Sequence, residues 1–536
     1  MTNRLYYGDN LQVLRDDIAS ASVDLIYLDP PFNSNANYNI LFKSKTGDGA
    51  DAQIEAFEDT WHWNDHAEDA FDQVIRSGNT DAAELLRAMR QFLGENDMMA
   101  YLAMMAIRLI ELHRVLKATG SLYLHCDPTA SHYLKLLLDG VFGADRFINE
   151  IVWKRTTTKS DFRQGAKNWP RIHDTILHYG KAQAGPAVFH QPFAQYEEGY
   201  VAAKYRNVDD EGRAYTLGDL TAPGAGSRGH PRYEFLGFDK YWRYSKEKME
   251  ALLAEGRVVQ PSAGAMPRYK RYLDEVKGVA LGDVWTDIFA INAMAQERLG
   301  YPTQKPVALL ERIISASSNE GDVVLDPFCG CGTAIHAAQK LGRQWIGIDV
   351  THLAISLIEK RLRDAFPGIQ FEVHGTPKDR DSAEDLARRD KYQFQWWACS
   401  MVDALPYGGK KKGADGGIDG IIYFKPDGKR TEKAIVSVKG GENKSVAFVE
   451  QLAATMDREK APIGVLIMLP LPTREMESRA AAVGRFEDEW GRTYPRLQII
   501  TLAELFQGKK PDIPFVDPAS VKRAKREDTS QQGSLL

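Results

Sequence analysis

The stretch VVLDPFCGCGTA, residues 323–334, joins a short apolar segment to a glycine-rich turn and then to the start of a helix. Buried strands of a parallel sheet are typically short apolar runs, and ligands bind beyond their carboxyl ends. Glycine permits a tight turn and a close approach of the backbone to a ligand. Asp349 ends the next apolar run, where its carboxylate can accept hydrogen bonds from ribose hydroxyls. The stretch therefore predicts an α/β fold with a ligand site at a strand end.

The spacing of these glycines restricts the ligand. It matches neither the G-x-G-x-x-G pattern of dinucleotide sites nor the G-x-x-x-x-G-K-[ST] pattern of phosphate cradles. A ligand with a ribose and no phosphate fits better, and S-adenosylmethionine is such a ligand. The alternative is a plain tight turn between a strand and a helix.

A second strand-end motif lies near the N-terminus, where SVDLIYLDPPF spans residues 22–32. Prolines remove backbone donors and make the turn rigid, so it presents carbonyls and the Asp29 carboxylate. The Asp29 carboxylate and the Pro30 carbonyl could accept both hydrogens of an aromatic amine and aim its lone pair at a methyl donor. This chemistry depends on positioning and electrostatics. Phe32 can stack on a base that has left the duplex. The alternative is an ordinary proline-rich turn.

Together, the two motifs resemble those of amino-group DNA methyltransferases in which the catalytic motif precedes the cofactor motif. The resemblance covers about 1–182 and 283–365, and it implies a circularly permuted Rossmann-like sheet. It also implies that Asp29, Pro30, Pro31 and Phe32 form the catalytic motif. Asp before Pro-Pro favours adenine N6 as the target, whereas Ser-Pro-Pro-Tyr is more typical of enzymes that methylate cytosine N4. Cytosine N4 stays as the alternative.

The resemblance further implies which residues hold S-adenosyl-L-methionine. They are the Asp of Gly8-Asp9 at the cofactor adenine, the segment 303–306 near its methionine moiety, the turn 326–333, and the acid that binds the ribose. The residues so implied are Asp9, Gln304, Lys305, Pro306, Asp326, Phe328, Gly330, Gly332, Thr333 and Asp349.

Residues 183–282 interrupt the α/β pattern and are expected to form the target-recognition insertion. Between Arg228 and Tyr272, ten Lys or Arg residues stand against five Asp or Glu residues, with aromatics interleaved. Basic side chains neutralise phosphates, and some read base edges. The candidate contacts to double-stranded DNA are Trp242, Arg243, Arg268, Lys270 and Arg271. The alternative is a solvated charged face over an aromatic core.

A further α/β domain is expected at 391–514. Asp419 precedes one apolar run and Lys439 ends the next, and this arrangement resembles the PD-(D/E)XK nuclease superfamily, specifically Mrr-like restriction domains. The resemblance implies that Asp419 binds Mg²⁺ and that Lys439 helps orient or activate water. Ser437 stands where that family has an acid, and Glu450 is the best substitute by position. Cleavage of DNA, DNA binding by a degenerate nuclease fold, and a structural ion pair remain open.

Helices and strands are expected at definite places in the two methyltransferase-like halves, 1–182 and 283–375. Residues 33–95 suggest loops and short helices, the polar stretch 374–390 suggests a domain boundary, and 515–536 suggests a disordered tail. Helices are expected at about 98–115, 130–142, 306–317, 332–341 and 353–366, and strands at 22–28, 120–125, 148–152, 174–179, 323–325 and 344–349.

The composition sets outer limits on these interpretations. The chain has 536 residues, a formal net charge of −5 and four cysteines without the spacing of a zinc site. It has no long apolar run and no signal region, so we expect a cytoplasmic, nucleoid-associated protein without a membrane span. A homodimer or a partner from a restriction or defence system is a further expectation. His125-Cys126-Asp127 ends a strand at the functional edge, where it either lines the site or caps the next helix.

Overall fold

The computed structural model describes residues 2–31, 62–157, 167, 169–182, 188–196, 198–222, 229–292, 295, 297–299, 301, 303–407, 417–427, 430–514 and 526–527, and the backbone alone of 37–42 and 52–58. The chain divides into two compact units. One comprises Met1–His190 and Asp283–Leu536, and the other is Gln191–Gly282. The expected start of the insertion, residue 183, and nearly all of the expected tail lie outside the described residues.

The first unit is built on a nine-stranded sheet with the order β16-β6-β7-β5-β2-β17-β18-β1-β19. β7 runs antiparallel to both of its neighbours, and the other neighbouring pairs are parallel. β2 and β17 are adjacent although they are far apart in the chain. The strands are β1 Arg4–Tyr7, β2 Val23–Leu28, β5 Leu116–Cys126, β6 Phe147–Lys154, β7 His173–Gly180, β16 Val284–Trp285, β17 Val323–Asp326, β18 Gln344–Asp349 and β19 Glu372–His374.

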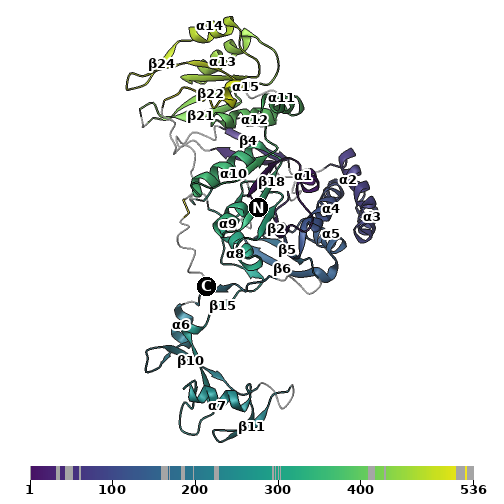
Figure 1. Ribbon diagram of the computed structural model, residues 1–536, viewed down its shortest axis with the longest axis vertical. Helices are drawn as coiled ribbons and strands as arrows, with labels where there is room; N and C mark the ends of the chain where they lie inside the picture. The colour runs from purple at the N-terminus through teal and green to yellow at the C-terminus, as the bar shows by residue number, and fades with distance from the viewer. Residues whose placement is uncertain are drawn as a thin grey trace. The chain divides into compact units, whose positions relative to one another are not determined.

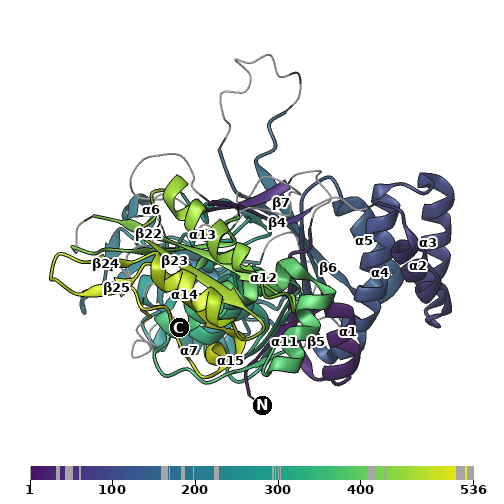
Figure 2. The ribbon, with the colours of Figure 1, turned by 90° about the horizontal axis from the view of Figure 1, so that it is seen from above.

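Helices cover both faces of this sheet (Figure 1). Side chains alternate between the faces of a strand, so Ile26 and Leu28 of β2 enter one core while Leu25 and Tyr27 enter the other. Figure 2 shows that α2, α3, α4 and α5 gather together on one side. The helices of the first core are α1 Asn10–Asp17, α2 Asp65–Arg76, α3 Thr80–Leu93, α4 Asp97–Val115 and α5 Ser131–Phe142, and those of the second are α8 Val307–Ser317, α9 Thr333–Lys340 and α10 His352–Ala365.

The helices and strands expected in the methyltransferase-like halves are confirmed, with small shifts at their ends. Residues 33–95 differ from expectation, because they contain the regular helices α2 and α3 and a hairpin of β3 Asn37–Phe42 and β4 Ala52–Glu58. α2 buries Ala67, Ala70, Phe71 and Val74 at helical spacing. In the sequence these few apolar residues are separated by the polar residues of the outer face, so the helical pattern is weak.

The C-terminal part of the first unit has its own five-stranded sheet in the order β20-β21-β22-β23-β26. α11, α12 and α15 contribute to the core on one face, and α13 and α14 to the core on the other. The elements are α11 Arg380–Arg389, α12 Lys391–Met401, β20 Leu405–Pro406, β21 Gly420–Phe424, β22 Glu432–Lys439, α13 Val446–Arg458, β23 Ile463–Met468, α14 Arg474–Ala482, a hairpin of β24 Arg485–Glu487 and β25 Thr493–Pro495, β26 Leu497–Thr501 and α15 Leu502–Phe506.

The polar stretch 374–390, expected to mark a domain boundary, is largely a helix. α11 buries Ala383, Leu386 and Ala387, which recur at helical spacing and pack in the C-terminal core. Asp379 caps the helix through a reciprocal pair of hydrogen bonds with Ser382. α11 therefore packs with the C-terminal sheet.

The second unit has a four-stranded sheet in the order β13-β14-β10-β9 and a small core that includes the buried ring of Trp242. Within the described parts of both units, no helix is long and apolar enough to cross a membrane. The elements of the second unit are β8 Phe193–Ala194, α6 Glu198–Lys204, β9 Asn207–Val208, β10 Ala214–Asp219, β11 Arg232–Phe235, β12 Phe238–Tyr241, α7 Lys246–Ala254, β13 Val258–Val259, β14 Arg268–Tyr272 and β15 Val279–Ala280.

Candidate active site

A cavity of about 400 Å³ lies where the carboxyl ends of β1, β2, β17 and β18 meet. It contains both strand-end motifs, because parallel neighbouring strands deliver their following residues to one edge of the sheet. Pro306 and Gly332 adjoin the lining without being part of it. The predicted site residues that line the cavity are Asp9, Asp29, Pro30, Pro31, Gln304, Lys305, Asp326, Phe328, Gly330, Thr333 and Asp349.

Asp29 stands directly after β2 and lines this cavity. Its Oδ2 accepts a hydrogen bond from the Lys305 ammonium. Its Oδ1 is buried and has no hydrogen-bond partner among the described residues. Pro30 and Pro31 continue the wall, whereas Phe32 lies outside the described residues. One carboxylate oxygen is therefore engaged and the other is left for a donor in the cavity.

The segment before α8 holds Lys305 in place. The Gln304 amide donates to the Glu297 carbonyl at 2.6 Å and accepts from the Leu299 N–H at 2.8 Å. Thr303 has φ +59°, in the left-handed region that branched side chains rarely adopt. Pro306 then occupies the position that precedes α8. These hydrogen bonds and restricted backbone angles fix the path of the chain here, so that the Lys305 ammonium contacts Asp29.

The glycine-rich turn requires its glycines for two different reasons. Gly330 has φ +48° and Gly332 has φ +74°, both in the left-handed region. A Cβ on Gly332 would lie 2.7 Å from Cγ1 of Ile358 on α10. Burial raises the pKa of the Asp326 carboxyl well above its usual value, although the N–H of Phe328 donates to it at 3.1 Å.

Asp349 ends β18 and ties the turn to the next helix. Its Oδ2 accepts from the Gly330 N–H at 2.9 Å, and its Oδ1 accepts from the Thr351 N–H and hydroxyl at 2.9 and 2.8 Å. Burial raises the pKa of this carboxyl to about 6, and these hydrogen bonds oppose the shift. The carboxylate is thus fixed in orientation at the cavity wall.

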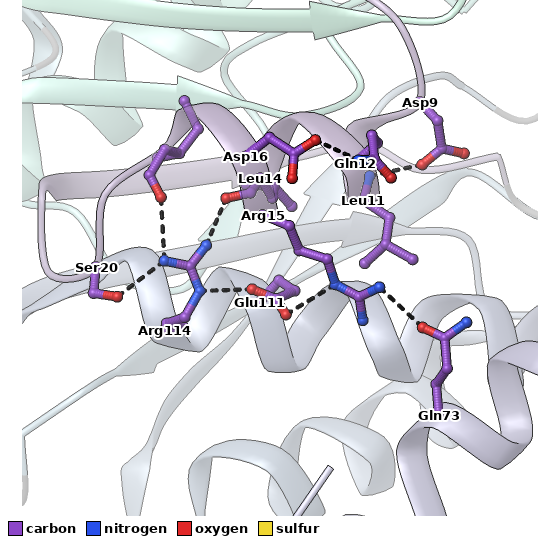
Figure 3. A network of polar contacts seen from close by, with 11 residues as sticks. Asp9, Leu11, Gln12, Leu14, Arg15, Asp16, Ser20, Gln73, Glu111 and Arg114 are labelled. Carbon is purple, nitrogen blue, oxygen red and sulfur yellow. Dashed lines mark hydrogen bonds and ion pairs between the residues drawn. The ribbon is translucent and has the colours of Figure 1, made fainter. Parts of the chain in front are cut away.

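Asp9 is held by residues that sequence reasoning missed. Its side chain caps α1 through the Leu11 N–H at 2.7 Å and accepts from Arg108 at 2.9 Å (Figure 3 shows Asp9 at the start of α1). Arg108 is buried on α4 and also donates to the Asn10 side chain at 2.6 Å. An arginine among the buried apolar residues of α4 is the signal that could have found it.

Helix α1, which carries Asp9 at its start, is fastened to its neighbours by a polar network (Figure 3). Glu111 of α4 accepts from Arg15 at 3.2 Å and from Arg114 at 2.6 Å. Arg15 also donates to Gln73 of α2 at 3.0 Å. These contacts hold α1 against α4 and α2, and with it the residue expected at the cofactor adenine.

Two tyrosines in the cavity wall were also missed. Tyr27 lies on β2 two residues before Asp29, and Tyr301 contacts the glycine-rich turn, where a Cβ on Gly330 would meet its ring at 3.3 Å. Burial raises the pKa of both hydroxyls well above the usual value. Alternation along the strand could have pointed to Tyr27, whereas Tyr301 lies in an irregular segment that gives no such pattern.

The predicted DNA contacts of the insertion have different environments. Trp242 is fully buried, and its ring N–H donates to the Tyr233 carbonyl at 2.8 Å, so this residue serves the core and offers no surface to DNA. Arg243 and Arg271 are exposed. Arg268 is paired with Asp219, and the Lys270 ammonium lies 5.1 Å from the centre of the Tyr215 ring.

The nuclease-like residues do not form a metal site. The buried Asp419 carboxylate accepts from the Val438 N–H at 2.6 Å and from the Ser437 hydroxyl at 3.3 Å. The Lys439 ammonium lies over the Phe448 ring, and Glu450 is exposed and 4.0 Å from Arg479. No group of three or more His, Cys, Asp or Glu side chains in the described residues could hold a metal ion. These residues therefore do not fit the expected Mg²⁺.

Two family models match separate parts of the chain. Residues 23–360, which include both strand-end motifs and the second unit, match a model described as DNA methylase. Residues 400–507 match a model described as NACHT-associated inactive Restriction Endonuclease 1.

Several characterised proteins are similar to the methylase part. The type II methyltransferase M.EcaI of Enterobacter cloacae is 31% identical over 366 residues, covering 67% of this chain and 69% of the relative. The StyLTI Mod subunit of a type III restriction-modification enzyme of Salmonella typhimurium is 27% identical over 64% of this chain and 50% of its own length. The DNA adenine methyltransferase YhdJ of Escherichia coli is 47% identical over 15% of this chain and 27% of its own length. The chain thus spans half or less of the last two proteins.

Proposed function

The chain belongs to the DNA methylase family, and on that premise we propose that it transfers a methyl group from S-adenosyl-L-methionine to N6 of adenine in double-stranded DNA. The observation that carries the proposal is the buried Oδ1 of Asp29, which has no partner among the described residues and shares a cavity with the glycine-rich turn. A buried acceptor without a donor is costly. An amine N–H of the substrate fits there.

Methyl transfer requires a localised lone pair on the exocyclic amine nitrogen. In the free base this lone pair is delocalised into the ring. Asp29 Oδ1 and the Pro30 carbonyl would accept the two amine hydrogens and favour a tetrahedral nitrogen. Lys305 binds the other Asp29 oxygen and so holds the carboxylate in one orientation. Fixed dipoles in a site that excludes water contribute most where charge develops. Phe32 would stack on the extruded base.

The cavity offers a suitable place for the methyl donor. Asp349 would bind the ribose hydroxyls, Asp9 the adenine end, and the backbone of 328–332 would lie against the cofactor, where glycine leaves room. Gln304 and Lys305 would lie near the methionine moiety. When bound, S-adenosyl-L-methionine supplies a methyl group on a sulfonium that an amine nitrogen can attack.

Adenine is favoured over cytosine by the residue that opens the catalytic turn and by the similarity to a protein described as a DNA adenine methyltransferase. The test incubates the full chain with methyl-labelled cofactor and mixed-sequence duplex DNA, followed by digestion and mass spectrometry of the nucleosides. Labelled N6-methyladenine is the expected product. Label in N4-methylcytosine alone would overturn the base assignment, and the absence of any label would overturn the proposal.

The finer features of the fold follow from the same reasoning. We infer a circularly permuted methyltransferase sheet, because the catalytic strand β2 precedes the cofactor strands β17 and β18 in the chain while β2 and β17 are neighbours in the sheet.

The insertion would bind DNA through exposed basic residues such as Arg243 and Arg271. A place in restriction–modification is supported by the similarity to M.EcaI and to the StyLTI Mod subunit.

For the C-terminal domain we propose a nuclease-like PD-(D/E)XK fold that does not cleave DNA. Asp419 is already bonded to Val438 and Ser437, and Glu450 lies near Arg479 instead of a metal site. The matching family model is described as inactive. Incubation with unmethylated DNA and Mg²⁺ should leave the DNA intact. Cleavage that Asp419→Ala abolishes would overturn this proposal.

A further inference from the structure

A chain of buried polar groups leads away from the cavity beside Asp29. Tyr27 lines the cavity, and its hydroxyl lies 2.9 Å from Nδ1 of His125 on β5. Nε2 of His125 lies 3.2 Å from Oδ2 of Asp174 on β7. Nε of Arg155, a residue whose side chain is 44% exposed, lies 3.0 Å from Oδ1 of Asp174. Groups on three neighbouring strands thus connect the cavity with the surface.

The chemistry of the partners sets the direction of the hydrogen bonds. Burial acts to raise the pKa of Asp174, but the hydrogen bond from His125 and the charges of Lys305 and Arg155 outweigh it, so the net shift is downward. An ionised carboxylate only accepts, so Nε2 of His125 carries the proton. In a neutral imidazole Nδ1 then accepts, and the Tyr27 hydroxyl donates to it.

This arrangement leaves the Tyr27 oxygen free to accept a proton while its own proton moves on to His125. Burial, followed by the charges of Asp29, Asp326 and Asp174, raises the pKa of the Tyr27 hydroxyl well above its usual value, so the group stays protonated until a proton arrives. Asp29 is a poorer destination, because its protonation would weaken the ion pair with Lys305.

Resting on the proposed methyl transfer, we propose that Tyr27, His125 and Asp174 form a relay that removes the proton released from the methylated amine. The amine lone pair forms the N–C bond, and the C–S bond breaks with its electron pair left on sulfur. One of the two amine hydrogens then leaves its acceptor, Asp29 Oδ1 or the Pro30 carbonyl, for the Tyr27 oxygen, and the electron pair of that N–H bond stays on nitrogen. The Tyr27 proton passes to His125 Nδ1, and Asp174 stabilises the resulting imidazolium. Tyr27 is the catalytic residue of the relay, and Asp174 is a positioning residue.

The alternative is a purely structural network in the core, since Tyr27, His125 and Asp174 are all buried. The same sheet face offers a matched comparison. Tyr123 lies beside Tyr27 on β5 and is equally buried, and its hydroxyl is 2.6 Å from the Ser317 hydroxyl, but it does not line the cavity. Loss of the Tyr123 hydroxyl removes a buried hydrogen bond without touching the relay.

The test measures single-turnover methyl transfer by the full chain from pH 5.5 to 9, together with cofactor affinity by calorimetry. Tyr27→Phe and His125→Gln should slow the transfer by ~10²-fold, should alter the shape of the pH profile and should leave the dissociation constant for S-adenosyl-L-methionine within threefold. Tyr123→Phe should leave rate and profile unchanged.

The relay is overturned if Tyr27→Phe transfers methyl groups within threefold of the wild-type rate at every pH, or if Tyr123→Phe slows the reaction equally. A wild-type protein that methylates nothing would instead overturn the proposed function. Asp174→Asn adds a second readout, because it should move the pH profile in the same sense as His125→Gln.

Discussion

The Asp29 carboxylate and the Lys305 ammonium form an ion pair across 276 positions of the chain. Asp29 directly follows β2, and Lys305 belongs to the segment that precedes α8. The pair joins the Asp-Pro-Pro turn to the segment 303–306 at the cavity where a substrate amine and a methyl donor would meet. It also leaves only Oδ1 of Asp29 for the substrate.

Replacement of Asp29 tests the acceptor directly. Asp29→Ala should lower methyl transfer by about 10²–10³-fold, the usual cost of losing one preorganised polar group, because no carboxylate then orients the amine. Cofactor affinity, measured by calorimetry, should change little, since Asp349 and the glycine-rich turn remain. A variant that methylates DNA at the normal rate would contradict the role assigned to this carboxylate.

Replacement of Lys305 separates stability from activity. Lys305→Met leaves the largely buried Asp29 carboxylate without its cation, so thermal unfolding should begin at a lower temperature, with a loss of about 3 kcal/mol for a broken buried pair. The double variant Asp29→Asn, Lys305→Met should recover most of that loss while it remains inactive. If the double variant is as unstable as the sum of the single ones, the pair is not coupled as the structure indicates.

The pKa of Asp349, raised to about 6 by burial, predicts a pH dependence of cofactor binding. The carboxylate must be ionised to accept the ribose hydroxyls, so affinity is full above pH 6 and falls as the pH drops through that value. The dissociation constant should rise about tenfold for each pH unit below 6. Asp349→Asn should bind more weakly with no such slope. A wild-type affinity that is constant from pH 5 to 7.5 would disprove the assignment.

Replacements of two glycines by alanine distinguish the cost of backbone strain from the cost of a steric clash. Gly332→Ala would suffer both, because φ is +74° and the new Cβ would lie 2.7 Å from Ile358. Gly368→Ala would suffer strain alone, because φ is +86° and nothing lies within 4 Å. We expect a loss of about 1–2 kcal/mol from strain at each site, with a larger loss and weaker cofactor binding for Gly332→Ala only. Equal effects in calorimetry would show that the contact with Ile358 can relax.

Much of the site could be predicted from the sequence because its residues follow apolar strands. Asp29 follows β2, the turn with Gly330 follows β17 and Asp349 ends β18, and parallel strands end together. The partner of Asp29 could not be found this way, because Lys305 lies in an irregular segment. Tyr27, His125 and Asp174 come from three separate strands, and only the strand order brings them together.

In the insertion, by contrast, the sequence pattern predicted a DNA contact at a residue that the structure places in the core. Trp242 stands beside Arg243 in a basic, aromatic stretch and looks like a surface residue for nucleic acid. A small unit needs large apolar side chains for its core, and the structure places this ring there, against Phe235 and Met249. Local composition cannot distinguish an aromatic residue that stacks on bases from one that fills a core.

Exposed basic residues of the insertion give the last prediction. Arg243 and Arg271 are exposed, and if each neutralises a phosphate, its replacement by Ala should reduce the slope of log affinity against log salt concentration by ~0.9. Arg232, whose guanidinium is paired with Asp239 at 2.9 Å, is the matched control, and Arg232→Gln should leave the slope unchanged. The measurement is the affinity of the full chain for a duplex between 50 and 200 mM salt, an interval over which counterion release changes affinity strongly. Slopes that are the same in the wild type and in both Ala variants would place the DNA-binding surface elsewhere, since a phosphate contact cannot be lost without fewer counterions being released.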